Sequence, residues 1–132
     1  MSFTASALSF LLEDLGKPVI VTGAQIPLSQ LRNDAYENVL GGLIVAGTFP
    51  TLPEVGLFFA GRVFRGNRTV KGSNDSFEAF RSEGSPPWLV KVGIGLEVDW
   101  GAVRRCRSIK PFRAHRSAPL LHISFRPTRI TR

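Results

Sequence analysis

The stretch "KPVIVTGAQIPLSQLRNDAYENVLGGLIVAGTFPTLPEVGLFFAG" (residues 17–61) decides the fold, because it contains two strand-like runs separated by a helical pattern. KPVIVTG (17–23) and EVGLFFAG (54–61) are short, continuous apolar runs, which are typical of buried parallel strands. Apolar residues between them recur at helical spacing and are expected to face the core: Tyr36, Val39, Leu40, Leu43 and Ile44. A strand–helix–strand unit with short loops predicts an α/β fold with a mainly parallel sheet and flanking helices.

Further elements are expected on both sides of this unit. A helix that is capped by Ser2 and ended by Gly16 precedes it. After the second strand, RVFRG (62–66) is expected to pair back as a hairpin, and LVKVGIGLEV (89–98) to form another strand.

The basic residues are concentrated at one end of the chain. Residues 1–102 contain eight Lys and Arg against ten Asp and Glu, whereas residues 103–132 contain nine Lys and Arg and no acid, which accounts for the net charge of +7. We therefore divide the chain into a domain, 1–102, and a basic tail, 103–132, that is expected to be disordered. The tail could bind phosphate backbones, or it could be the translation of a shifted reading frame or an unspliced intron. The abrupt change of composition favours the second origin, so nucleic acid is not the expected partner.

Composition disfavours several other classes of protein. No apolar run reaches the roughly eighteen residues of a membrane-spanning helix. The first residues lack the basic region of a signal peptide, and the single cysteine, Cys106, forms no internal disulfide, so we expect a cytoplasmic protein. Cys106, His115 and His122 match no zinc-ligand spacing, and we expect neither a metal nor another cofactor.

Two loops are expected to meet at one edge of the sheet. Ligands of open parallel sheets bind at the carboxyl ends of the strands. The loop Gly23–Gln25 leaves one such end, and the chain after the second strand leads through the hairpin to Lys71. Asp34 and Glu37 could act as paired carboxylates near this edge, although an N-terminal capping pair for the central helix explains them better.

The order and the amino-acid sequences of the segments resemble those of the cytoplasmic type I branch of the L-asparaginase family. The matching pieces are "TASALSFLLEDLGKPVIVTGAQIPL", "RNDAYENVLGGLIVAG", "PEVGLFFAGRVFRGNRTVK" and "FEAF", which run in family order up to about Asp99. The resemblance implies hydrolysis of L-asparagine to L-aspartate and ammonia through a threonine nucleophile, with a second threonine, a lysine and an aspartate in support. The family's "T-T-K" lysine corresponds to Lys71, which would act as a base. Its "T-G-A/S-Q" loop makes Ala24 and Gln25 candidate substrate contacts.

Departures from the family pattern limit this expectation. The "G-G-T" segment that carries the nucleophile is not found, and the chain starts at the methionine of the family's "G-T-D-T-M". Val70 stands in place of the threonine before the lysine, and Ala35 replaces a glycine. We therefore expect an incomplete asparaginase N-terminal domain that is inactive alone.

Two expectations about partners remain open. The family forms dimers and tetramers, so a homo-oligomer is expected. The alternative function is a non-catalytic interaction protein whose basic tail contacts nucleic acid, or whose domain associates with a full-length relative.

Overall fold

A computed structural model describes residues 1–84, 86–105 and 113–114. Its main sheet has five strands in the order β2-β3-β4-β7-β8. Their bounds are β2 Val19–Val21, β3 Val55–Phe59, β4 Arg62–Arg65, β7 Val90–Val92 and β8 Leu96–Val98. Strands β2 and β3 are parallel, and the other three pairs are antiparallel. The α/β fold is confirmed, with a sheet that is mixed rather than mainly parallel because hairpins extend the parallel pair.

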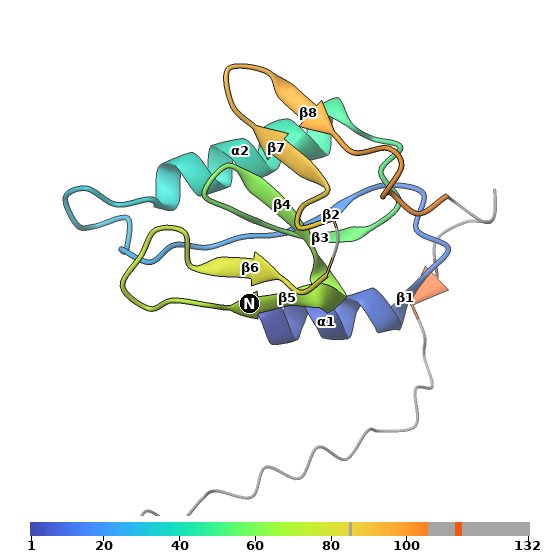
Figure 1. Cartoon of the computed structure of the whole chain (residues 1–132), viewed down its shortest axis with the longest axis horizontal. Helices are drawn as coiled ribbons and strands as arrows, with labels where there is room; N and C mark the ends of the chain where they lie inside the picture. The colour runs from blue at the N-terminus through green and yellow to red at the C-terminus, as the bar shows by residue number, and fades with distance from the viewer. Residues whose placement is uncertain (85, 106–112, 115–132) are drawn as a thin grey trace, which may run out of the picture.

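Two helices cover opposite faces of this sheet (Figure 1). Helix α1, Ser2–Leu11, lies over a core that includes Leu57 and Phe59. Helix α2, Ala35–Thr48, lies over a second core that includes Phe58 and Val63. Successive residues of β3 thus enter different cores, because side chains alternate along a strand. All five residues of β3 are buried, as expected for a strand between two helical layers.

The first helix differs from its prediction at both ends. It begins with Met1 at the N-cap position and without a side-chain cap, so Ser2 is not the capping residue. It ends at Leu11 rather than near Gly16. The chain there enters a short strand, β1 Leu12–Glu13, which pairs with β9 Arg113–Ala114. Strand pairing with a distant segment therefore ends the helix before its own C-terminal signal.

The buried face of α2 is not the apolar face that the sequence indicates. Tyr36, Val39, Leu40, Leu43 and Ile44 are all exposed. The buried positions are Asn38, Gly41, Gly42 and Val45. A Cβ atom on Gly41 would lie 2.3 Å from Cζ of Phe58, and one on Gly42 would lie 3.3 Å from Cγ2 of Ile20. The helix lies on the sheet through its small residues because only they allow this close approach.

Two more segments depart from their sequence-based description. Residues 89–98 form a hairpin, β7 and β8, rather than one strand, because the chain turns at 93–95, where the N–H of Gly93 donates to the carbonyl oxygen of Gly95 at 2.9 Å. The polar stretch after β4 contains a 3₁₀ turn, Gly66–Arg68, and a separate two-stranded sheet. Its strands are β5 Thr69–Lys71 and β6 Phe80–Ser82. Most of this second sheet's connection, 72–79, is exposed.

Candidate active-site edge

Lys71 is the last residue of β5, where it pairs with Phe80 of β6. Its side chain is exposed. The strand begins at Thr69, which is buried and whose hydroxyl donates to the carbonyl oxygen of Arg65 at 2.6 Å. Thr69 thus ties the lysine-bearing strand to the end of β4.

The loop Gly23–Gln25 is held by the first turns of α2. The carboxylate of Asp34 accepts hydrogen bonds from the main-chain N–H of Gln25 at 3.0 Å and of Ile26 at 2.9 Å. Asp34 stands at the N-cap position but makes no side-chain capping bond, so the predicted capping pair is wrong. Its carboxylate oxygens accept hydrogen bonds from the N–H groups of the preceding loop rather than from the first N–H groups of the helix.

Asn38, one turn further along α2, connects three segments. Its Nδ2 donates to the carbonyl oxygen of Gly23 at 2.9 Å and to Oδ2 of Asp34 at 3.0 Å. Its Oδ1 accepts from the main-chain N–H of Ala60 at 3.0 Å, in the turn between β3 and β4. Asn38 is 2% exposed, so these bonds replace water that cannot reach it. The carboxyl ends of β2 and β3 are therefore fixed to one buried amide.

Asp34 gives this loop a dependence on pH. Burial alone would raise the pKa of Asp34, but hydrogen bonds from the N–H groups of Ile26 and Gln25 and from Asn38 outweigh it and hold the pKa below its ordinary value. Because the folded-state pKa lies below the ordinary value, the ionised carboxylate of Asp34 stabilises the loop at pH values above the ordinary pKa. This stabilisation is lost as the pH falls through the folded-state pKa.

We expect the amide resonances of Gln25 and Ile26 to shift together, with a common midpoint below the ordinary pKa of an aspartate. NMR titration of labelled protein measures this midpoint. Asp34→Asn should remove this common midpoint, because the loop N–H groups then face an amide that does not titrate. Shifts of the same size in Asp34→Asn would contradict the assignment.

Gln25 brings the two predicted regions together. Its side-chain Nε2 donates to the carbonyl oxygens of Asn74 at 2.9 Å and Ser76 at 3.2 Å. These acceptors lie three and five residues after Lys71 in the exposed connection to β6. The structure thus links the Gly23–Gln25 loop to the segment that follows Lys71, as the sheet topology predicts. Ala24, between Gly23 and Gln25, is exposed.

An open groove of about 610 Å³ lies beside this edge. Asp34 and Asn38 line its polar end, and Phe58, Phe77 and Ile44 line an apolar part. Lys71, Ala24 and Gln25 do not line it. The candidate residues therefore lie next to the groove rather than inside it.

Within the described residues, no group of three or more His, Cys, Asp or Glu side chains is arranged to hold a metal ion. Cys106, His115 and His122 lie outside those residues. In the same part of the chain, no helix is long and apolar enough to cross a membrane.

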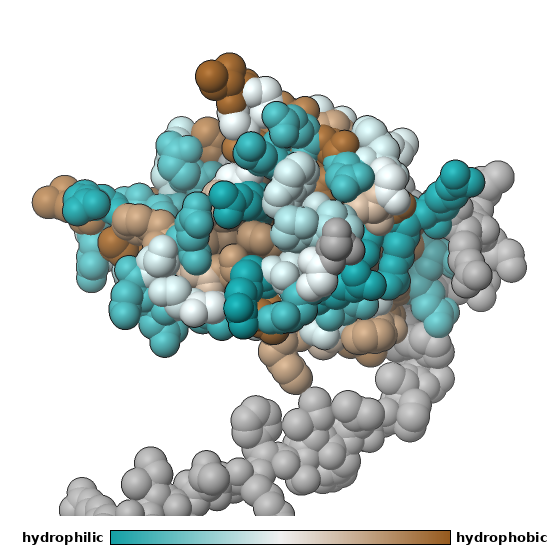
Figure 2. Space-filling model, viewed as in Figure 1, coloured by the Kyte–Doolittle hydropathy of each residue, from teal (hydrophilic) through white to brown (hydrophobic). Residues whose placement is uncertain are grey.

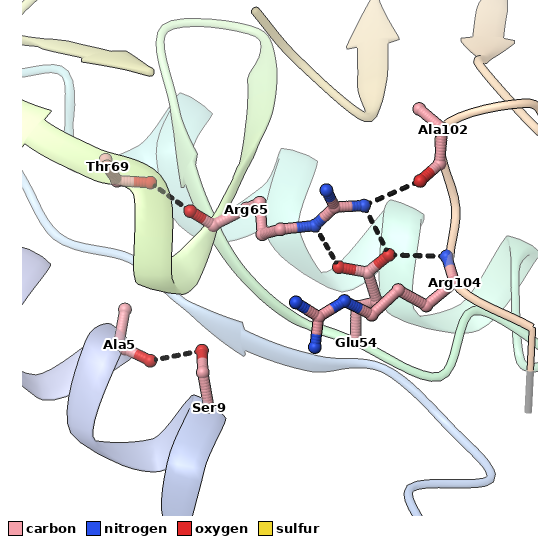
Figure 3. A network of polar contacts seen from close by, with 7 residues as sticks. All are labelled: Ala5, Ser9, Glu54, Arg65, Thr69, Ala102 and Arg104. Atoms are coloured by element: carbon pink, nitrogen blue, oxygen red, sulfur yellow. Dashed lines mark hydrogen bonds and ion pairs between the residues drawn. The ribbon is translucent and has the colours of Figure 1, made fainter. Parts of the chain in front are cut away.

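Arg65 forms an ion pair with an internal carboxylate, that of Glu54 (Figure 3). Its Nε and Nη2 donate to the two oxygens of Glu54 at 2.6 and 2.8 Å. Hydrogen bonds to Glu54 raise the pKa of Arg65 above its ordinary value despite burial. Nη2 also donates to the carbonyl oxygen of Ala102 at 2.6 Å, and the N–H of Arg104 donates to Glu54 at 2.7 Å. The pair therefore anchors the chain that leaves β8, up to the start of the basic tail.

The family described as "Asparaginase, N-terminal" matches residues 1–104. The chain belongs to the asparaginase family. This match ends at the residue whose N–H binds Glu54, and most of the basic tail lies outside the described residues. The predicted disorder of the tail, and the alternative that the tail contacts nucleic acid, both concern that undescribed part.

Several relatives illustrate how much of an asparaginase the chain represents. It is 57% identical to L-asparaginase 1 of Escherichia coli K12 over 96 residues, which are 73% of this chain and 28% of that protein. It is 49% identical over 105 residues to the 60 kDa lysophospholipase of Mus musculus, covering 80% of this chain and 18% of the relative. The crystal structure of L-asparaginase I from Vibrio cholerae superposes with a TM-score of 0.76 at 48% identity, covering 86% of this chain and 34% of that one. The chain thus spans about a third or less of each relative.

Three residues of this asparaginase-family chain have roles that their sequence pattern did not indicate. Asn38 lies on an apolar helix, where a lone amide at a core position is the only signal. Asp34 is of a residue type that is common at N-cap positions, so its type indicated a cap rather than a contact with the loop. Glu54 directly precedes β3, and its partner Arg65 is the last residue of β4, so a charge at each open end of a hairpin is the signal that could have paired them.

Proposed function

We propose that this chain forms one side of an amidohydrolase site that converts L-asparagine and water to L-aspartate and ammonia. The bridge from Gln25 to the segment after Lys71 supports the proposal, because it links the candidate substrate loop to the segment that follows the candidate base. Membership of the asparaginase family and the similarity to L-asparaginases supply the reaction class. The type I resemblance makes the cytoplasm the proposed location.

Each candidate residue has a distinct proposed role. Lys71 acts as a base in the triad that removes the proton of a threonine hydroxyl, which then attacks the amide carbon of the substrate. The leaving nitrogen takes up a proton and departs as ammonia, and water hydrolyses the acyl-threonine to release aspartate. Ala24 and Gln25 contact the substrate. Gln25 also keeps the loop next to the lysine-bearing segment through its side-chain amide.

We expect the 132-residue chain to release no ammonia by itself. Thr22 donates its hydroxyl to the carbonyl oxygens of Phe58 at 3.0 Å and Asn38 at 3.3 Å, and Thr69 donates to Arg65. Both hydroxyl groups are therefore engaged in the fold rather than directed at a base. Lys71 is exposed, and the desolvation that suits a lysine base must come from groups outside the described residues.

A hybrid enzyme tests the role of Lys71. The 96 matched residues of this chain replace their counterparts in E. coli L-asparaginase 1, and ammonia release from asparagine is measured. We expect an active hybrid whose kcat falls about 10²–10⁴-fold in Lys71→Met, the usual contribution of a general base.

Lys91→Met is the matched control, because Lys91 is also an exposed lysine on a strand, β7. It should leave kcat unchanged. Equal activity of the Lys71→Met and Lys91→Met hybrids would refute the catalytic role, and ammonia release by the 132-residue chain alone would refute its inactivity. Val70→Thr tests whether the missing hydroxyl limits the hybrid, in which case kcat should rise.

A further inference from the structure

Two hydrogen bonds fix the peptide units on either side of Ala24. The carbonyl oxygen of Gly23, which belongs to the peptide unit before Ala24, accepts from Nδ2 of Asn38 at 2.9 Å. The N–H of Gln25, which belongs to the peptide unit after Ala24, donates to the carboxylate of Asp34 at 3.0 Å. Asn38 and Asp34 lie one turn apart at the start of α2 and are hydrogen-bonded to each other. Both peptide units are therefore held from the same side.

The planarity of the peptide unit then determines where the main-chain groups of Ala24 point. In a trans peptide unit the C=O and the N–H point in opposite directions. Because the C=O of Gly23 points toward Asn38, the N–H of Ala24 points away from α2. Because the N–H of Gln25 points toward Asp34, the C=O of Ala24 also points away from α2. Ala24 thus presents one donor and one acceptor on the same side.

These two main-chain groups are open to a ligand. Neither forms a hydrogen bond with the part of the chain that the structure describes, and Ala24 is exposed. The surface around the 22–34 loop, at the left of Figures 1 and 2, carries hydrophilic and apolar side chains side by side. Because neither kind dominates, directed hydrogen bonds would select a small polar ligand there better than a uniform charge or an apolar face.

Asn38 connects this arrangement to the sheet. Its Oδ1 accepts from the N–H of Ala60, in the turn between β3 and β4, at 3.0 Å. Its side chain is buried, so water does not compete for these bonds, and the amide cannot rotate without losing partners on both sides. The direction of the Gly23 carbonyl is therefore set by the position of the sheet and not by the loop alone.

We propose that Asn38 is a positioning residue that turns the N–H and C=O of Ala24 toward the substrate. The inference rests on the proposed function, in which Ala24 contacts the substrate, and it names the residue that fixes this contact. Asn38 lies beneath the loop and acts through the peptide unit between Gly23 and Ala24. Its loss should weaken the binding of asparagine more than the chemical step, because the proton transfer belongs to Lys71.

Asn38→Asp changes only one end of this connection. The new side chain has nearly the same shape, and one of its oxygens can still accept from the N–H of Ala60. The other oxygen faces the carbonyl oxygen of Gly23 and the carboxylate of Asp34, which are both acceptors. It repels them while it is ionised and can donate to one of them once it is protonated. Burial and the carboxylate of Asp34 should raise the pKa of the introduced carboxyl, so acidification should reverse the change.

Steady-state kinetics of the hybrid with E. coli L-asparaginase 1 supply the first measurement. At about pH 8, Asn38→Asp should raise the KM for asparagine about tenfold relative to the parent hybrid, the effect of losing one or two hydrogen bonds to the substrate. The ratio of the two KM values should fall toward one as the pH is lowered. Partial unfolding of the variant would instead lower the apparent kcat at unchanged KM, so this comparison separates positioning from destabilisation.

Gln30→Glu is the matched control, because it makes the same exchange of an amide for a carboxyl near the start of α2. Gln30 is exposed, and its side chain forms no hydrogen bond with the described residues. The other charged side chains of the neighbouring groove, Arg32 and Glu37, are exposed and are present in both variants. Gln30→Glu should keep the KM of the parent hybrid at every pH.

A second measurement uses the full 132-residue chain and needs no activity. The carbonyl-carbon resonance of Gly23 reports the hydrogen bond from Asn38 directly. It should move in Asn38→Asp at neutral pH, return toward its parent position on acidification, and stay unchanged in Gln30→Glu.

The outcomes distinguish this inference from the proposed function. An active hybrid that depends on Lys71, but in which Asn38→Asp keeps the parent KM, would overturn this inference alone. A Gly23 carbonyl resonance that does not respond to Asn38→Asp would do the same. A parent hybrid that is inactive, or that is unaffected by Lys71→Met, would overturn the proposed function and this inference with it.

Discussion

Arg65→Met should lower the free energy of unfolding by about 3–5 kcal/mol, the largest loss of stability that we expect from one substitution. The side chains of Glu54 and Arg65 are 4% and 11% exposed, and the methionine fills much of the arginine's volume. The cost arises because the carboxylate of Glu54 stays buried without its partner. The N–H of Arg104 remains to solvate it, but two of its three hydrogen bonds are lost.

Urea unfolding at one fixed protein concentration measures this loss, because association would otherwise alter the apparent stability. Arg81→Met is the control, since Arg81 forms an ion pair with Glu83 in which both side chains are largely exposed. The control should change the free energy by no more than about 1 kcal/mol. The double variant Glu54→Leu, Arg65→Met should recover much of the loss, since it leaves no unpaired charge. Equal effects of Arg65→Met and Arg81→Met would contradict this account.

Asn38→Leu should cost about 2–5 kcal/mol, because it leaves the N–H of Ala60 and the carbonyl oxygen of Gly23 without their buried partner. Leucine has a similar size, so the effect comes from unsatisfied polar groups rather than from a cavity. Asn38→Leu should destabilise the structure around Ala60 locally, in addition to lowering the free energy of global unfolding. Hydrogen exchange at Ala60 should accelerate even under conditions where the sheet stays folded.

Gln25→Leu provides the comparison for Asn38→Leu. It also removes two hydrogen bonds to main-chain carbonyls, but they are exposed, and water can replace the lost donor. Its cost should therefore stay below about 1.5 kcal/mol. If Gln25→Leu destabilises the chain as much as Asn38→Leu does, burial is not the factor that makes the Asn38 bonds important.

The strand–helix–strand core of the fold could be predicted because the hydropathy pattern and the turn-forming residues indicate the same elements there. EVGLFFAG is apolar throughout, and β3 is buried throughout. The packing of α2 was predicted on the wrong face because glycine carries no hydropathy signal, although Gly41 and Gly42 decide how closely the helix approaches the sheet. The mixed character of the sheet was missed for a related reason. The apolar pattern of 89–98 indicates one continuous strand, whereas Gly93 and Gly95 form the turn between two antiparallel strands.

The location of the candidate site could be predicted from the sequence, but the side-chain contacts that form it could not. Sheet topology placed the Gly23–Gln25 loop near the segment after Lys71, and Gln25 bridges them. The support provided by Asp34 and Asn38 could not be predicted, because a residue type does not specify which distant main-chain groups it will meet. The proposed catalytic role of Lys71 came from family resemblance, and the hybrid enzyme is its test.

Helix α2 is attached to the fold unevenly, and this protects the candidate loop from disturbance. Asp34 and Asn38 bind the loop and the β3–β4 turn at the amino-terminal end of the helix, whereas its middle lies on glycines that present no side chain to interlock with the sheet. Val45, in the last turn, is fully buried in the core with Phe58, so apolar packing holds the carboxyl-terminal end and hydrogen bonds hold the amino-terminal end. Substitutions in the apolar contacts near Val45 would therefore leave in place the hydrogen bonds that fix the Gly23–Gln25 loop.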